Sequence, residues 1–197
     1  MRRTSPFLVY SLALLLALTA AGCKRATEAA APEAAAMPPF IADHTIKDLM
    51  LNVVDTNADV VWLSVTTVAS DKGLVETRPT NDAEWTRVRQ GAIMLAEAAN
   101  LLMVPGRHVA RPGEKSDTPG VELEPSEMEE LINKDRPAFY RHAQDLYKAA
   151  MLAAEAAEKK DADKVFEIGE TIEQACENCH KTYWYPNEQI PPLPSAK

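Results

Sequence analysis

The chain has 197 residues, and its 29 acidic against 21 basic residues give a formal charge of −8 at pH 7. Such an acidic chain is a poor partner for nucleic acid, whose phosphates repel it, so nucleic-acid binding is excluded from the expected functions. Most of the seven glycines lie outside the periodic segments, and alternating apolar and polar residues are scarce, which predicts an all-α fold.

An export signal is predicted over residues 1–22. Two arginines precede an apolar run over 7–21 that ends in small residues and is short for a membrane span. The junction that follows resembles a bacterial lipoprotein cleavage box, in which Cys23 becomes the lipidated first residue. Because Ala20 stands where such boxes usually carry leucine, ordinary signal-peptidase cleavage near Cys23 is the alternative. We therefore expect a periplasmic protein that a lipid on Cys23 anchors to a membrane.

Three segments are predicted after the signal. Residues 23–40 are rich in alanine, glutamate and proline, cannot bury enough apolar surface to fold alone, and are expected to form a flexible tether. One folded domain is expected over 41–186, followed by an extended proline-rich tail over 187–197. Without residues 1–22 the chain keeps 19 of its 21 basic residues against 29 acidic ones, a formal charge of −10.

The first predicted helix begins at Thr45, a capping residue, and its apolar residues recur three or four positions apart. Asp55-Thr56-Asn57 interrupts this stripe and predicts a kink or a restart of the helix. The valine-rich stretch 60–68 would suit a strand, but no partner strand is visible in the sequence, so we predict a helix there too. Residues 70–79 are predicted to be a connection.

A second helix is predicted from Thr80 or Asn81, with the apolar spacing of a near-parallel bundle, and Pro105 ends it. The segment up to Pro125 contains three Pro-Gly pairs and no periodicity, which predicts a long crossover exposed on the surface. Ser126 is expected to cap a short helix, with Glu129 completing a capping box.

A longer helix is predicted to open at Pro137, where proline is tolerated in the first turn. The last helix is expected from Asp161 or Asp163 to Pro186. Four main helices are thus predicted, and the apolar stripe of the last one continues into Cys176-Glu177-Asn178-Cys179-His180.

Cys-x-x-Cys-His is the attachment motif of c-type haem. Cys176 and Cys179 share one helix face, so each thiol can form a thioether with the haem, and His180 can bind the iron through a neutral ring nitrogen. A zinc site, a redox dithiol and a disulfide are the alternatives. Zinc needs two further ligands, but His44, His108 and His142 show no ligand spacing, and a thioredoxin-like dithiol lacks its βαβ setting.

Helix number, the crossover and the motif on the last helix make residues 45–185 resemble the class II cytochromes c, the cytochrome c-prime group of four-helix bundles. Tyr183 matches the aromatic residue that this family places three positions after the histidine. Trp184 departs from the family, which commonly has a basic residue there. The resemblance implies haem c with iron, bound covalently, once per chain. It also implies that Met50, on the first helix, is the candidate sixth iron ligand, with core packing as the alternative.

Other polar residues carry weaker expectations. His142 lies beside the inward stripe of its helix and could reach the haem, but a surface or hydrogen-bonded role is favoured. The crossover could likewise cover the haem edge, although a surface loop is favoured. Partners for the haem propionates are expected among five arginines, because guanidinium matches carboxylate geometry: Arg87, Arg89, Arg107, Arg136 and Arg141.

An electron carrier that works with redox partner proteins is the favoured function. The alternative is a five-coordinate haem protein that binds nitric oxide or carbon monoxide, which needs an empty, apolar distal side. No distal acid and base pair is evident, so we expect the protein not to be an enzyme such as a peroxidase. A homodimer is compatible with these expectations, and a haem-free interaction protein would require unmodified cysteines.

Overall fold

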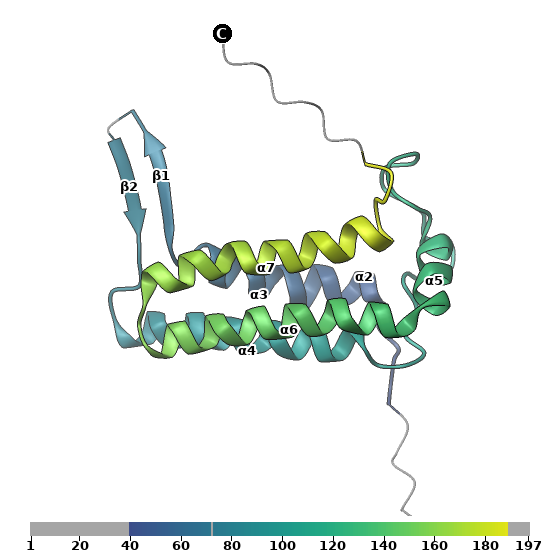
Figure 1. Ribbon diagram of the computed structural model, residues 1–197, viewed down its shortest axis with the longest axis horizontal. Helices are drawn as coiled ribbons and strands as arrows, with labels where there is room; N and C mark the ends of the chain where they lie inside the picture. Colours follow the sequence, from purple (N-terminus) through teal and green to yellow (C-terminus); the bar gives the residue numbers. More distant parts are fainter. Residues whose placement is uncertain (1–39, 72, 189–197) are drawn as a thin grey trace, which may run out of the picture. The chain divides into compact units, whose positions relative to one another are not determined.

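The computed structural model describes residues 40–71 and 73–188 (Figure 1). The predicted signal, Cys23 and the tether as far as residue 39 lie outside the described residues, as does the predicted tail beyond Glu188. None of the helices within the described ranges is long and apolar enough to cross a membrane.

The first helical rod consists of α2 (Ile46–Leu49), a π-helical turn η1 (Met50–Val54) and α3 (Asp55–Trp62). Thr45 caps it through a capping box: its hydroxyl accepts the Asp48 N–H at 3.0 Å, and the Asp48 carboxylate accepts the Thr45 N–H at 3.1 Å. The predicted interruption is present. It begins one turn early, where the Asp55 N–H bonds the Met50 carbonyl five residues back, and the α-helix resumes at Asp55.

A hairpin of β1 (Thr66–Ser70) and β2 (Gly73–Thr77) follows, with Thr66 opposite Thr77 and Val68 opposite Val75. The helix predicted over 60–68 is therefore wrong beyond Trp62. The segment interpreted as a connection supplies the partner strand, and its pairing satisfies the backbone of the β-branched residues. Gly73 makes the turn possible because its φ is +113°, a value that glycine adopts freely and that strains the backbone of other residues.

The other helices are α4 (Asp82–Leu102), α5 (Pro125–Lys134), α6 (Arg136–Glu158) and α7 (Ala162–Tyr183). The predicted caps at Asn81 and Asp161 are confirmed, since each side chain accepts a backbone N–H three residues on at 3.0 Å. The cap predicted at Ser126 is wrong. Glu124 forms the capping box instead, because Pro125 takes the first helical position, where its missing N–H costs nothing.

The first rod, α4, α6 and α7 run side by side, with α5 at one end and the hairpin at the other (Figure 1). The all-α four-helix bundle predicted from the sequence is confirmed, with the hairpin as an addition. Buried alanines on α6 allow close helix approach, among them Ala150 and Ala153, which are fully buried. A second cluster, including Leu102, Phe139 and Tyr183, closes the end near α5.

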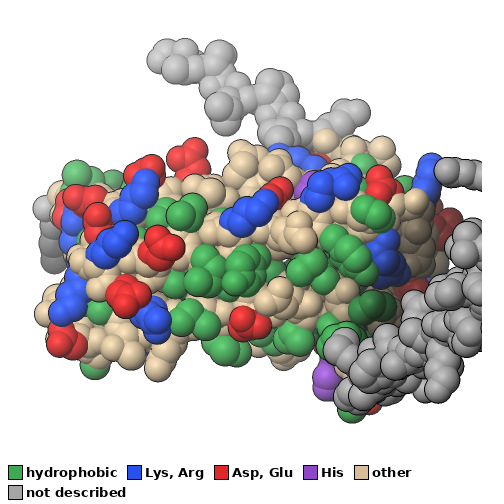
Figure 2. Space-filling model, turned by 60° about the horizontal axis from the view of Figure 1, so that its bottom comes forward, with side chains coloured by type: hydrophobic (Ala, Val, Ile, Leu, Met, Phe, Trp, Pro, Cys, Tyr) green, Lys and Arg blue, Asp and Glu red, His purple; other side chains and the backbone are tan. Residues whose placement is uncertain are grey.

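The face formed by α4 and α6 carries both charge signs, and hydrophobic side chains gather between the charges (Figure 2). The large hydrophobic residues that these two helices expose are Met94, Leu101 and Leu152. The bundle therefore has one partly apolar side.

Close packing of the first rod against α4 leads to a stability prediction. A Cβ added at Gly91 would lie 2.5 Å from Val60 Cγ1, and the β-branched valine cannot easily turn away. Gly91→Ala should lower the free energy of unfolding by about 1–3 kcal/mol, although alanine favours helices. Urea unfolding measures this. Gly169→Ala is the control with a milder clash, since its Cβ would lie 3.2 Å from Trp62 Cδ1; a stabilised Gly91→Ala protein would contradict the prediction.

Candidate functional site

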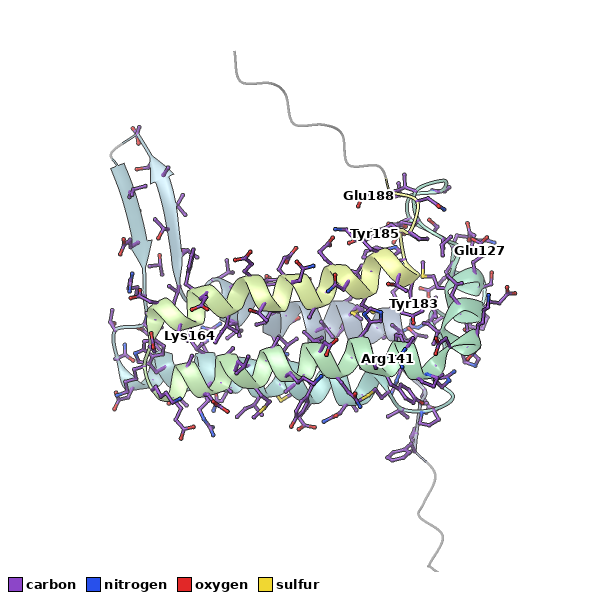
Figure 3. The ribbon with its side chains drawn as sticks, viewed as in Figure 1. Glu127, Arg141, Lys164, Tyr183, Tyr185 and Glu188 are labelled. Atoms are coloured by element: carbon purple, nitrogen blue, oxygen red, sulfur yellow. The ribbon has the colours of Figure 1, made fainter. Side chains whose placement is uncertain are left out.

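A small, mainly apolar cavity lies between the four main helices. The described residues that line it come from η1, α4, α6 and α7: Met50, Val54, Leu102, Phe139, His142, Ala143, Leu146, Ala175, Cys176, Cys179 and His180. Figure 3 shows Tyr183 and Arg141 toward the α5 end of the bundle and Lys164 at the other end. The structure thus brings the three motif residues and Met50 to one cavity.

Both thiols of the motif are free and partly buried. Burial raises the pKa of Cys176 to about 11, with further contributions from the charges of Glu173 and Glu177. Burial also raises the pKa of Cys179 to about 12. A redox dithiol needs a lowered thiol pKa, so these values disfavour that interpretation. Within residues 40–71 and 73–188, no group of three or more His, Cys, Asp or Glu side chains is placed to hold a metal ion, so the zinc alternative gains no support.

His180 is half-buried, and burial lowers the pKa of its imidazole, opposed by the charge of Glu177. Its neutral form, which an iron ligand requires, is therefore favoured. Among the described residues, none forms a hydrogen bond with a nitrogen of the His180 ring. Its neighbours are aromatic: Trp184 at 5.0 Å between ring centroids and 88° between planes, and Tyr185 at 5.9 Å and 60°.

Glu177, inside the motif, is held by two neighbours. The Tyr185 hydroxyl donates to one carboxylate oxygen at 2.5 Å, and Lys181 Nζ lies 3.0 Å from the other. These contacts lower the pKa of Glu177, with the Tyr185 hydrogen bond as the largest cause. The Glu177 carboxylate is thus kept charged within the motif.

Met50 is half-buried and lines the same cavity as His180. Met50 is the first residue of the π-helical turn, and its carbonyl accepts a hydrogen bond from the Asp55 N–H, five residues on. Such turns are frequent at functional sites. The placement agrees with the candidate ligand suggested by the family resemblance, and ligation itself stays a prediction.

His142 is placed differently from the expectation. It lines the cavity, and its ring lies edge-on to Tyr183 at 5.7 Å and 88°. The sequence favoured a surface or hydrogen-bonded role; the structure leaves His142 half-buried at the cavity, and its contact with the haem stays a prediction. The signal was its position three residues after Phe139 and four before Leu146, which places His142 on the buried stripe of α6.

Two of the candidate arginines are engaged by hydrogen bonds, and a third, Arg89, forms an ion pair with Glu158 at 3.7 Å. Arg107 is buried, and its guanidinium donates to the carbonyls of Leu101, at 3.0 Å, and His44. Arg136 donates to the side chain of Asn133. Both therefore serve the local structure of their segments.

Arg141 is a candidate arginine whose charge acts on a residue close to the motif. It is exposed on α6 (Figure 3). Burial raises the pKa of Tyr183, and the positive charge of Arg141 opposes this rise. Arg87 and Arg89 lie near the start of α4, about 20 Å along the helix from Leu102 at the cavity. Arg141 is thus best placed for a propionate.

The crossover between α4 and α5 is more than a surface loop. Carbonyls of His108 and Val109 accept the N–H groups of Ile46 and Lys47, at 2.9 and 3.0 Å, and so satisfy the first turn of α2. Val109 itself is buried. The crossover therefore belongs to the end of the bundle where the motif lies.

The crossover also contacts the residue that follows α7. The Leu123 N–H donates to the Trp184 carbonyl at 2.8 Å. Burial raises the pKa of the Glu122 carboxylate, and the Trp184 side chain is among the neighbours that lower it. Sequence reasoning missed this contact because no local pattern links residues about 60 positions apart. It also missed Tyr185, whose partner Glu177 lies two turns earlier.

Comparison with known proteins gives a family match. The model of the family described as Cytochrome C′ matches residues 81–184, just over half of the chain. Two solved structures of cytochrome c prime from Alcaligenes xylosoxidans are similar. One is a nitric oxide complex of a mutant (17% identity, TM-score 0.44, covering 72% of this chain and 97% of that one). The other is a ferrous variant with bound nitric oxide (16%, 0.44, 71% and 97%). No curated protein matches the chain.

Proposed function

Because the chain belongs to the cytochrome c′ family, we propose that it is an electron carrier whose haem is held by Cys176, Cys179 and His180. Covalently attached haem c with iron is the cofactor of this family. Its members are typically periplasmic and often homodimeric. Bound haem c supplies a one-electron couple at its iron.

The observation that carries the proposal is the convergence of two thiols, the His180 imidazole and a thioether on one cavity whose other lining residues, His142 apart, are apolar. Cys176 and Cys179 lie one turn apart on α7, where both sulfurs face the same side. His180 offers a neutral ring, and Met50 offers a soft sulfur ligand from the opposite helix. This donor set would hold haem c, and a bound Met50 would leave no open position on the iron for a substrate, which suits electron transfer.

The negative charge around Cys176, a region that we call the attachment edge, favours a basic redox partner. Glu173, Glu177 and Asp55 all act electrostatically on the Cys176 thiol, so carboxylates surround it. Complementary charges speed the encounter of two proteins, and salt screens this effect. We therefore propose that a positively charged redox protein docks at this edge.

Glu173→Gln tests the docking edge. Glu173 is exposed on α7, so the change removes one charge without disturbing the core. Electron exchange with a basic, soluble c-type cytochrome, measured by stopped flow at low salt, should slow about two- to fivefold. The rate should also depend less on ionic strength. Glu97→Gln, on exposed α4 surface, is the matched control, and equal effects of the two variants would remove the support for this edge.

Gas binding is the second candidate because the cavity wall is mainly apolar, with Val54, Leu102 and Leu146 among its residues. An apolar distal side without a bound methionine would accept nitric oxide or carbon monoxide. Besides the motif, His142 is the one titratable side chain among the described lining residues. A peroxidase-type reaction needs a second acid or base beside it, so we propose that the protein is not an enzyme.

We also propose that a lipid on Cys23 anchors the protein in the periplasm. The wild type should fractionate with membranes and carry the mass of a lipidated N-terminal cysteine. Cys23→Ser should release or mislocalise it, because the lipid supplies the membrane affinity. A mature N-terminus downstream of Cys23 in soluble wild-type protein would disprove the anchor.

A further inference from the structure

Trp184, the residue just after α7, is fixed to the motif through the backbone. Its N–H donates to the His180 carbonyl at 2.7 Å, and the Tyr185 N–H donates to the same carbonyl at 3.0 Å. The indole lies edge-on to the His180 ring at 5.0 Å. Backbone and side chain of Trp184 therefore both depend on where His180 lies.

The crossover holds Trp184 from the other side. The Leu123 N–H donates to the Trp184 carbonyl at 2.8 Å. Burial raises the pKa of the Glu122 carboxylate, and the Trp184 side chain is among the neighbours that lower it, so the two side chains lie close together. That carboxylate is itself fixed, since it accepts the Ser116 hydroxyl and the Thr118 N–H, each at 3.0 Å. Trp184 is thus clamped between the end of α7 and the crossover.

We propose that Trp184, clamped by the crossover, is a positioning residue that sets the orientation of the His180 ring toward the haem. Histidine ligands are usually oriented by a hydrogen bond from the second ring nitrogen. The described residues provide His180 with no such partner, while edge-to-face aromatic contacts have a preferred geometry. Aromatic packing here takes the place of the hydrogen bond. The inference rests on the proposed role of His180 as iron ligand.

Three variants of the full chain, matured with haem, isolate this role. Trp184→Leu removes the aromatic edge, whereas Trp184→Phe keeps an aromatic ring and loses the indole N–H. Glu122→Ala removes one arm of the clamp and leaves the Leu123 hydrogen bond. Trp62→Leu is the control, because Trp62 is a second tryptophan that contacts α7: it is half-buried, whereas Trp184 is 37% exposed, and its indole N–H donates to the Gly169 carbonyl at 3.0 Å.

The readout is the proton NMR spectrum of the ferric protein, in which the haem methyl shifts depend on the orientation of the axial imidazole. Trp184→Leu should shift and broaden the methyl resonances, and Glu122→Ala should shift them in the same direction by less. Trp184→Phe, which also loses the contact with Glu122, should shift them no more than Glu122→Ala does, and Trp62→Leu should stay close to the wild type. Acid-acetone extraction of each variant checks covalent haem separately, so failure of the proposed function shows as extractable haem in the wild type.

Unchanged methyl resonances in Trp184→Leu, or equal shifts in Trp62→Leu, would overturn the positioning role. Unchanged resonances in Glu122→Ala would overturn the part assigned to the crossover. If Trp184→Leu fails to fold, Trp184→Phe still tests the proposal. Methyl resonances that shift more in Trp184→Phe than in Glu122→Ala would overturn it, because the retained aromatic ring is expected to keep the His180 ring oriented.

Discussion

Replacing both Cys176 and Cys179 with serine should abolish covalent haem attachment, because the hydroxyl groups cannot form the thioethers. Wild-type protein made with the cytochrome c maturation machinery should stay coloured through acid-acetone extraction, and the double variant should lose all its colour. Cys23→Ser is the matched control. It removes the third cysteine of the chain and should leave the haem in place. Colour released from the wild type would refute the central assignment.

The double variant should also lose stability. Haem would leave behind a cavity lined mainly by apolar groups, and its binding free energy would no longer favour the folded state. We expect the free energy of unfolding to fall by about 3–5 kcal/mol or more, as after truncation of a large buried side chain. Thermal unfolding followed by far-UV circular dichroism measures this loss.

Local chemistry explains why much of the fold could be predicted. Asn81 and Asp161 cap helices through their own neighbours, and Pro137 lies in the first turn of α6 as expected. Each signal lies within one turn of the feature that it specifies. The same holds for the haem motif, whose residues are brought together by one turn of α7.

The features that could not be predicted depend on distant pairings. Val68 becomes part of a strand only because Val75 pairs with it, and the strand containing Val75 is too short to stand out in the sequence. Trp184 gained its partners from a crossover without periodicity. Ser126 lost its expected cap to Glu124 because the position of a single proline decides where a helix begins.

The residues that line the cavity could be predicted only in part. The sequence placed His142 beside the inward stripe and favoured a surface or hydrogen-bonded role, and the packing of α6 brings it to the cavity. Met50 was suggested by family resemblance and not by spacing, since 130 positions separate it from His180. Only the packing of the first rod against α7 brings the two residues to one site.

What the iron does depends on Met50. If its sulfur and the His180 imidazole are the two axial ligands, the protein should be low-spin in both oxidation states and should not bind carbon monoxide. Met50→Ala should then turn the haem high-spin and allow carbon monoxide to bind. The reduction potential should fall by roughly 100 mV, a fraction of the about 0.8 V that axial ligands span, because a thioether favours ferrous iron.

Two control variants separate the ligand from its surroundings. Met94→Ala removes an exposed methionine of α4 and should change nothing in the spectrum. His142→Phe removes the other side chain of the cavity, outside the motif, that could bind iron, so a high-spin His142→Phe protein with an unchanged Met50→Ala protein would make His142 the ligand. A wild type that is itself high-spin and takes up carbon monoxide would leave Met50 as a packing residue. The apolar wall would then serve gas binding, and the carrier function would give way to it.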